Sequence, residues 1–435
     1  MHMKYLRYLL LLLGRAVLFP VYFLSGFVPR RPDIIVFGSW GGHRFADNAA
    51  AFFMHCQATI SDRIRLVWLS RNQQIVKQLR AQGYEAHWLW SPAGMAAALR
   101  AYIHVFDCFP KDANFWFSRG AYKVNLWSGV PLKVFERDID TVDNRYYRLF
   151  HGNPAERLLL SIMMPWHVVK PDLIIATSDE TAAITARAFD LRPNRVHVTG
   201  FPRNDALLDP ELFLTRDANA VPQVFRDAVL SESTVFLYLP TFRDNGISIL
   251  DFDWDRLDAH LGRMNARLFF KTHPMDQSKY QTNYKNIIQL PQSTEVYTLL
   301  PGADCLISDY SSVIFDFMLL NRPIIYYTPD LADFEASCRK FNFRPSEVAV
   351  GPLCMSFPEL LAALDVLESG ALNFARGRQE SLLNRLHRYR DAHSSERVLA
   401  LINQRFYGGM MHYKAHYSEG DSKADGRDSY KRRSD

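Results

Sequence analysis

Short apolar runs alternate with stretches of helical periodicity along most of this chain. In the first half, the runs that predict strands are 33–38, 65–70, 85–89, 103–106, 122–126 and 173–177. After Arg195 the pattern begins again, with predicted strands at 196–199, 234–239, 267–271, 287–290, 305–307 and 324–327. Such alternation is typical of parallel sheets covered by helices on both faces. The pattern therefore predicts an α/β fold with two doubly wound domains, joined near residues 191–194.

The N-terminus carries a different pattern, because residues 8–28 are apolar almost throughout and basic residues stand on both sides of them. The length approaches the roughly 20 apolar residues that a membrane span needs. However, Arg15 would then lie within the bilayer, at a cost of about 2.5–3.5 kcal/mol, and Pro20 would interrupt the helix. We expect residues 1–31 to form a helix, or a broken pair of helices, lying in the membrane interface. A single span is the alternative.

The composition indicates a class of protein but no particular reaction. The 435 residues are 48% hydrophobic and 22% charged, as in a globular protein of about two domains. A net charge of +5 suits a membrane surface or an anionic substrate and is too small to argue for nucleic acid. The five cysteines are scattered, which argues against disulfides and zinc and for the cytosolic side.

The predicted organisation has four parts. They are a membrane-associating segment (1–31), an N-terminal Rossmann-like domain (32–192), a C-terminal Rossmann-like domain with terminal helices (193–407) and a disordered tail (408–435). Helical patterns at 357–368 and 374–407 end the second domain.

The polar turn Ser-Asp-Tyr-Ser-Ser at 308–312 is the first candidate site. It lies between a predicted strand (305–307) and a predicted helix (313–320). The free N–H groups and the positive dipole end of a helix start attract anions, and the hydroxyls of Ser311 and Ser312 add donors. A plain helix cap is the alternative.

Basic residues end the neighbouring predicted strands as well. Arg203 lies in the turn after 196–199, Arg243 after 234–239, and Lys271 and His273 after 267–271. The carboxyl ends of parallel strands meet at one edge of a sheet, so these side chains are expected to converge on an anion such as a diphosphate.

In the first half, two turns after strands carry candidate acceptor groups. The glycine-rich turn at 38–48 contains Arg44, which suits an acceptor phosphate, and the turn at 127–133 ends in Lys133. The sequence has no His-Glu-x-x-His motif, and no metal site is predicted.

Five of these motifs, in this order, resemble the CDP-glycerol glycerophosphotransferase family, which contains the teichoic-acid primases and polymerases. They are FGSW with Asp47-Asn48, TGFPRND (199–205), YLPTFRD (238–244), KTHP (271–274), and residues 307–317 with Arg322-Pro323. The resemblance covers roughly residues 1–370. It implies a GT-B-type fold behind a membrane-associating segment, and the transfer of glycerol phosphate or ribitol phosphate from a CDP-alditol to a lipid-linked acceptor, with release of CMP.

The strand ends and the resemblance together give three sets of expected site residues. The catalytic set is His273, Ser128 and Lys133; the donor-binding set is Arg203, Arg243, Lys271, Asp309, Ser311, Ser312 and Arg322; the acceptor set is Arg44, Asp47, Asn48 and Trp127. One position departs from the family, which usually has Trp-His-Gly where this chain has Trp127-Ser128-Gly129. A serine cannot take a proton near neutral pH as an imidazole can.

The expected partners are CDP-glycerol or CDP-ribitol, a lipid-linked acceptor or growing polymer, and membrane phospholipid at the cytosolic face of the cytoplasmic membrane. No cofactor is required by the sequence. Mg²⁺ is left as an option, although no metal motif points to it. Two alternatives share the architecture. One is a GT-B glycosyltransferase that uses a nucleotide sugar, and the other is an inactive polymer-binding assembly protein.

Overall fold

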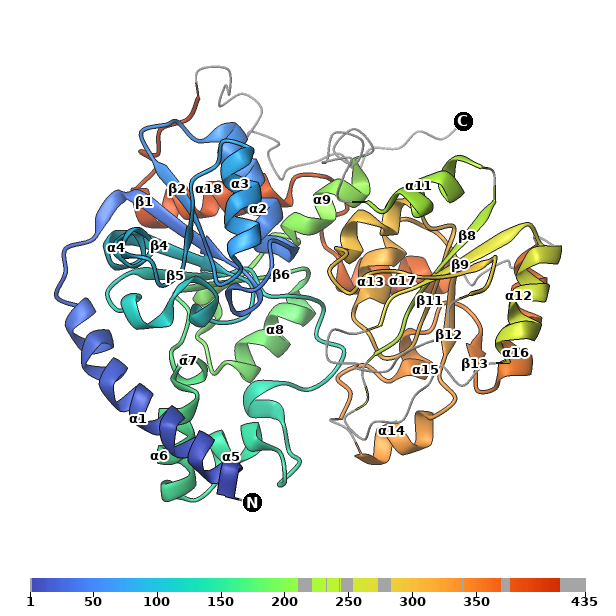
Figure 1. Cartoon of the computed structure of the whole chain (residues 1–435), viewed down its shortest axis with the longest axis horizontal. Coiled ribbons are helices and arrows are strands. Elements are labelled where there is room, and N and C mark those ends of the chain that lie inside the picture. The colour runs from blue at the N-terminus through green and yellow to red at the C-terminus, as the bar shows by residue number, and fades with distance from the viewer. Residues whose placement is uncertain are drawn as a thin grey trace.

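The computed structural model describes residues 2–209, 221–231, 233–241, 243, 253–272, 283–337, 340–368 and 376–414. Two parallel sheets stand side by side, each with helices on both faces (Figure 1). This is the α/β architecture that the alternating pattern predicts. Both sheets are buried on both sides, which explains why their strands are continuous apolar runs.

The first sheet has seven strands in the order β3-β2-β1-β4-β5-β6-β7. They are β1 (Arg31–Gly38), β2 (Arg65–Ser70), β3 (Ala86–Trp88), β4 (Ala101–Phe106), β5 (Tyr122–Asn125), β6 (Leu173–Ala176) and β7 (Val196–Val198). Its helices are α2 (Asp47–Thr59), α3 (Gln73–Ala81), α4 (Pro92–Arg100), α5 (Arg145–His151), α6 (Pro154–Met163), α7 (Pro165–Val168) and α8 (Asp179–Ala188). Short 3₁₀ turns connect them: η1 (Trp40–Gly42), η2 (Pro110–Ala113), η3 (Phe115–Phe117), η4 (Glu136–Asp138) and η5 (Pro193–Arg195).

The second sheet has six strands in the order β10-β9-β8-β11-β12-β13. They are β8 (Thr234–Leu239), β9 (Ala266–Phe270), β10 (Ile287–Gln289), β11 (Cys305–Ser308), β12 (Ile324–Tyr327) and β13 (Leu353–Cys354). The helices after β7 are α9 (Pro202–Leu208), α11 (Gln223–Leu230), α12 (Trp254–Arg263), α13 (Val313–Met318), α14 (Leu331–Ser337), α15 (Pro345–Val348), α16 (Phe357–Glu368), α17 (Arg376–Leu386) and α18 (Ser394–Tyr407), with 3₁₀ turns η7 (Val296–Thr298) and η8 (Leu300–Gly302).

The strand at 196–199 was expected to open the second domain, and the structure corrects this. β7 pairs in parallel with β6, so that Ile174 lies opposite Val196 in the first sheet. Only the short turn η5 separates α8 from β7, so the chain has no room to leave the first domain before the strand forms. The chain passes to the second domain after β7, at α9.

The pattern at 374–407 also differs, because it forms two helices that serve different domains. α17 ends at Leu386, and α18 returns to the first domain, where it packs on α2 and α9 (Figure 1). The carboxylate of Asp205 accepts the backbone N–H groups of Ser394 and Ser395, both at 2.8 Å, and so caps the start of α18.

The predicted disordered tail begins later than expected. Residues 408–414 lie against the first domain: Met411 is buried, and Tyr413 forms an antiparallel bridge with Ile60. The rest of the predicted tail, 415–435, lies outside the described residues.

The N-terminal segment forms one helix, α1 (His2–Ser25), and one of its faces packs on the first domain. Tyr22 stacks on Phe115 with ring centroids 4.5 Å apart, and Phe19 meets Trp116 edge-on at 5.6 Å. The guanidinium of Arg15 lies 5.0 Å from the centroid of the Trp166 ring, which gives the charge a partner within the protein.

The helix continues through Pro20, although that proline was expected to interrupt it. Pro20 and Ala16 are both exposed. Water can therefore hydrate the Ala16 carbonyl, which the proline leaves without its helical donor. Among the described residues, no helix combines the length and the apolar character that crossing a membrane requires.

We expect Asp205→Ala to lower the free energy of unfolding by about 1–3 kcal/mol, because two buried N–H groups lose their acceptor. Asp62→Ala, at an exposed residue, is the matched control and should stay within about 0.5 kcal/mol of the wild type. Urea unfolding followed by circular dichroism measures both. Equal stability of the two variants would show that the cap does not hold α18 in place.

Candidate active site

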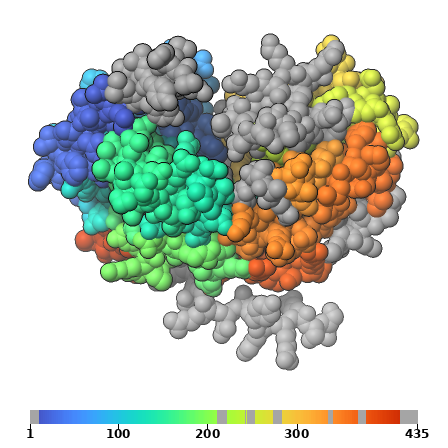
Figure 2. Space-filling model, turned by 90° about the horizontal axis from the view of Figure 1, so that it is seen from below, coloured from blue at the N-terminus to red at the C-terminus, as the bar shows by residue number. Residues whose placement is uncertain are grey.

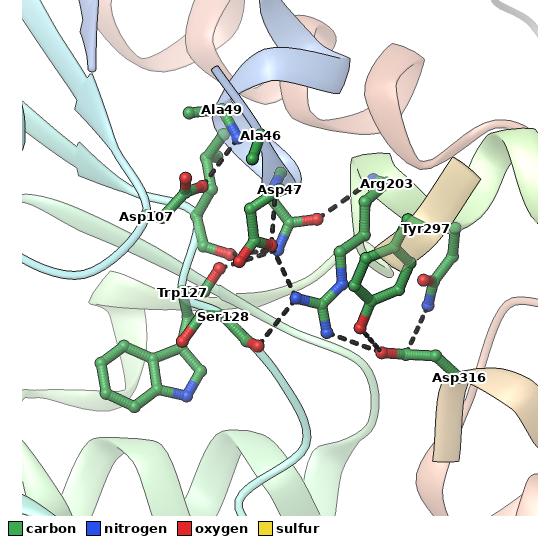
Figure 3. A network of polar contacts seen from close by, with 12 residues as sticks. Ala46, Asp47, Ala49, Asp107, Trp127, Ser128, Arg203, Tyr297 and Asp316 are labelled. Carbon is green, nitrogen blue, oxygen red and sulfur yellow. Dashed lines mark hydrogen bonds and ion pairs between the residues drawn. The ribbon is translucent and has the colours of Figure 1, made fainter. Parts of the chain in front are cut away.

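The guanidinium of Arg203, in the first turn of α9, connects the two domains. Its Nη1 donates to Asp47 Oδ1 at 2.6 Å and to the Ser128 carbonyl at 2.7 Å, both in the first domain. Its Nη2 donates to Asp316 Oδ2 in the second domain at 2.6 Å (Figure 3). The arginine and both carboxylates are buried. The sequence pattern therefore predicts the convergence correctly, but the partners of Arg203 are protein carboxylates.

Both carboxylates are held in place by further hydrogen bonds. Asp316, on α13, also accepts from the Tyr297 hydroxyl at 2.6 Å and from the Asn204 side chain at 2.7 Å. Asp47 opens α2 with a left-handed φ of 64° and accepts from the Trp40 indole at 3.1 Å. Burial opposes the charge of Arg203, but the charges of Asp47 and Asp316 outweigh it and hold the pKa of the guanidinium well above its ordinary value.

A buried carboxylate behind this network fixes the start of α2. Asp107, which directly follows β4, accepts the Ser39 hydroxyl at 2.5 Å and the Ala49 N–H at 2.7 Å. Burial, and then the charge of Asp47, raise the pKa of Asp107 well above its ordinary value. Asp107 thus fixes the loop at 38–48 to the end of β4. Asp47 and Asn48 lie in this loop after the first strand, as the sequence pattern indicates.

The turn at 127–129 contacts both domains. Asn48 Nδ2 donates to the Trp127 carbonyl at 2.7 Å, while the Trp127 ring packs between Phe135 and Phe189. Trp127 was expected to contact the acceptor, but the structure places its ring in this aromatic cluster. It therefore acts on the site through its backbone.

Gly129 brings this turn against the polar turn of the second domain. A Cβ atom on Gly129 would lie only 2.6 Å from Ser312 Oγ, so no larger residue fits there. Two predicted sites, around Ser128 and around Ser311-Ser312, are thereby neighbours across the domain junction. Ser128 uses its carbonyl to bind Arg203, and its side chain hydrogen-bonds with Cys108.

Arg243 forms a second buried ion-pair cluster. Its Nε donates to Asp330 Oδ2 at 2.6 Å, its Nη2 lies 2.9 Å from Asp309 Oδ2, and its Nη1 donates to the Thr241 carbonyl at 2.7 Å. Asp309 also accepts the Thr241 hydroxyl at 2.6 Å and the Tyr310 N–H at 2.6 Å. Burial is outweighed by the two carboxylates, which raise the pKa of Arg243. The pair Arg243–Asp309 fixes the turn at 308–312 to the end of β8.

Lys133 reaches the same cluster from the first domain. Its backbone bridges Phe341 in antiparallel fashion, and its Nζ lies 4.7 Å from the centroid of the Phe334 ring. The guanidinium of Arg243 lies over that ring too, at 5.0 Å. The structure thus brings Lys133 to the ion-pair cluster of Arg243 with Asp309 and Asp330.

Lys271 and Arg44 approach one another from opposite domains. Arg44 donates to the Gln292 carbonyl at 3.4 Å, which places it against the second domain near Lys271. Burial, and then the charge of Arg44, lower the pKa of Lys271 to about 8, although Glu295 opposes them. Burial, and then the charge of Asp47, raise the pKa of Glu295. Within the described residues, neither cation has a carboxylate in ion-pair contact.

Arg322 was expected to bind the donor, and the structure corrects this. It precedes β12, so it lies at the amino edge of the sheet, where its Nη1 donates to the carbonyls of Pro301 and Ala303, both at 2.7 Å. Ligands of doubly wound sheets bind at the opposite edge. His273 lies outside the described residues, so its role stays a prediction.

Several residues of the junction have no role predicted from the sequence. Asp107 and Asp330 each follow a predicted strand, so the rule that found Arg203 and Arg243 would have found them as well. Asp316 could have been noticed as a carboxylate within an apolar helix. For Tyr297 and Glu295 the sequence offers no signal that we recognise.

In the part of the chain that the structure describes, no three His, Cys, Asp or Glu side chains form a cluster that could hold a metal ion. The four described cysteines are free thiols. The expectation that no cofactor is required, with Mg²⁺ left as an option, stays a prediction.

We expect Arg44→Gln to raise the apparent pKa of Lys271 from about 8, because the neutral glutamine no longer disfavours the protonated amine. Glu295→Gln should lower it further, because a charge that favours the protonated amine is lost. The rate of Lys271 acetylation against pH, followed by mass spectrometry, measures both. Arg63→Gln, at an exposed residue, is the control. Shifts of the same sign in the two variants would disprove the proximity of these three groups.

Comparison with known proteins identifies relatives that match most of the chain. Residues 21–404 match the model of the family described as CDP-Glycerol:Poly(glycerophosphate) glycerophosphotransferase. A teichoic acid poly(glycerol phosphate) polymerase of Bacillus spizizenii is 26% identical over 79% of this chain and 86% of its own length. A teichoic acid ribitol-phosphate primase of the same species is 27% identical over 87% of this chain and 93% of its own.

A solved structure of the wall teichoic acid polymerase TagF superposes with a TM-score of 0.70. It covers 94% of this chain and 99% of the TagF chain, at 20% identity. This similarity confirms the fold, with its two parallel sheets.

Proposed function

Since the chain belongs to the CDP-glycerol:poly(glycerophosphate) glycerophosphotransferase family and is thus a transferase, we propose that it moves glycerol phosphate or ribitol phosphate from a CDP-alditol onto a teichoic-acid-type acceptor. The similar polymerase and primase of Bacillus spizizenii carry names from teichoic acid synthesis. Both alditols are represented among these names, so the donor is assigned here only as a class.

The observation that carries this proposal is the convergence of Lys271 and Arg44 at the domain junction. Like charges repel, and the lowered pKa of Lys271 reports that repulsion together with burial. Among the described residues, the carboxylate of Glu295 opposes this lowering, and burial and then the charge of Asp47 raise the pKa of Glu295 itself. A dianionic or diphosphate group between the two cations would relieve the repulsion. Phosphoryl transfer needs this kind of charge neutralisation more than it needs covalent help from the protein.

The reaction that fits is in-line attack of an acceptor hydroxyl oxygen on the β-phosphorus of the donor. The new phosphorus–oxygen bond forms on the acceptor while the bond to the CMP oxygen breaks, and CMP leaves with the electron pair. The hydroxyl proton passes to a base, for which His273 remains our predicted candidate. Ser128 is unsuited to that role, because a serine hydroxyl cannot take up a proton near neutral pH as an imidazole can.

We expect Lys271→Met to reduce kcat/KM for CDP-alditol by about tenfold or more, since one charge-assisted contact contributes roughly 1.5–3 kcal/mol. Lys77→Met, on the exposed side of α3, is the matched control and should retain wild-type turnover. CMP release from CDP-glycerol and from CDP-ribitol, with a lipid-linked acceptor, measures both. If wild-type protein binds nucleotide and releases no CMP from either donor, the assembly-protein alternative replaces this proposal.

We further propose that the enzyme works at the cytosolic face of the membrane and that α1 contacts the lipid. While one face of α1 packs on the first domain, the other exposes Leu13, Val17 and Leu24, at 56%, 72% and 64% of their surface. Phe27, just after the helix, is 84% exposed. Apolar side chains on one helix face favour the membrane interface.

Replacing Val17 and Leu24 by Glu should weaken flotation with phosphatidylcholine vesicles by about tenfold or more, since burying one such side chain contributes roughly 1.5–3 kcal/mol. The matched control replaces Val224 and Leu230, exposed apolar residues of α11 in the second domain, by Glu. If both double variants float as the wild type does, α1 is not the contact.

A further inference from the structure

A pocket of about 340 Å³ lies in the first domain, apart from the Arg203 network. It is formed by η4, α5, α6, the end of α7 and the end of α8. Its buried wall contains His167, whose Nδ1 lies 3.0 Å from Glu136 Oε2. Nothing in the proposed transfer reaction uses this pocket.

Three cationic side chains line the pocket, and two of them have no described carboxylate in ion-pair contact. Lys170 pairs with Asp190 at 2.7 Å. Arg137 lies over the Phe150 ring, with its Cζ 5.1 Å from the centroid, and Arg157 lines the pocket from α6. The lining side chains comprise three cations and the carboxylate of Glu136, and Asp190 pairs with only one of the cations, so the pocket has an excess of positive charge.

The same pocket has an apolar side that continues onto the surface. Leu149, Phe150 and Leu158 line it, and Leu158 is 66% exposed, next to the half-exposed Leu159. Their helix, α6, packs against α1, the helix with the exposed leucines and valine. In Figure 1 α1, α5 and α6 gather below the first sheet, and Figure 2, seen from below, shows this part of the first domain at the surface.

We propose that this pocket binds the phosphate-bearing head group of an anionic membrane lipid. Arg137 and Arg157 would contact the phosphate, because guanidinium groups bind its oxygens in pairs. Leu149 and Leu158 would contact the apolar part next to the head group. The inference rests on the proposed contact of α1 with the membrane, which brings the pocket to the depth of the head groups. It adds a preference for anionic lipid, which the apolar face of α1 cannot supply by itself.

The test uses the full chain and vesicles of phosphatidylcholine, with or without phosphatidylglycerol. The double variant Arg137→Gln, Arg157→Gln should lose about tenfold or more of the extra binding that phosphatidylglycerol gives, since each basic residue near an anionic surface adds to it. Its binding to pure phosphatidylcholine should be unchanged. The matched control, Arg63→Gln with Arg100→Gln, removes the same charge from exposed positions and should bind as the wild type does.

Two outcomes would overturn the proposal. An equal loss in the control would mean that only net charge matters. The other is calorimetric binding of soluble glycerol phosphate that is lost in the pocket variant while its vesicle binding is unchanged, because the pocket would then serve a soluble phosphate. Neither assay needs donor turnover, so failure here is separate from failure of the proposed reaction.

Discussion

The guanidinium of Arg203 is a buried charge that joins the two domains. It holds Asp47 at the start of α2 and Asp316 on α13, each at 2.6 Å. Burying three charges costs a great deal of hydration, and the two ion pairs offset it only while all three partners are present. Loss of the arginine would leave two carboxylates buried without a counter-charge. The triad lies beside the contact between Gly129 and Ser312, where the two candidate sites meet, and it supports that contact. α18 adds a second connection, because it starts beside Asp205 and ends on the first domain.

Much of the fold could be predicted because strands buried on both faces leave a strong pattern in the sequence. The runs at 65–70, 234–239 and 324–327 coincide with β2, β8 and β12. The pattern could not show which strand each strand pairs with, or which domain each helix packs on. β7 looks like any other strand, and only its pairing with β6 assigns it to the first sheet. The helical periodicity at 374–407 likewise carries no sign that α18 crosses to the other domain, because that contact is made by residues distant in sequence.

In the site, too, the local sequence pattern predicted the positions of residues, but not their contacts with residues distant in sequence. The rule that strand ends converge placed Arg203, Arg243 and Lys271 at the domain junction, and their positions confirm it. It also shows why Arg322 was misplaced, since that residue comes before its strand and not after it. The rule says nothing about which cations already have partners. Asp316 and Asp330 lie far from the arginines in the sequence, so their ion pairs appear only in the folded chain.

A cation that already has a carboxylate partner binds a phosphate less readily than one that has none. Arg243 has three of its nitrogens bound to Asp309, Asp330 and a carbonyl, so a ligand would have to compete with buried carboxylates. Asp309 itself holds the polar turn against β8, which makes the pair a support for the turn. Lys271 and Arg44 are in a different situation, because they repel one another and, among the described residues, neither is in ion-pair contact with a carboxylate. An anion gains most where positive charge is buried and uncompensated. We therefore propose that the donor phosphates bind on the Lys271–Arg44 side of the junction, with the Arg203 and Arg243 clusters fixing its geometry.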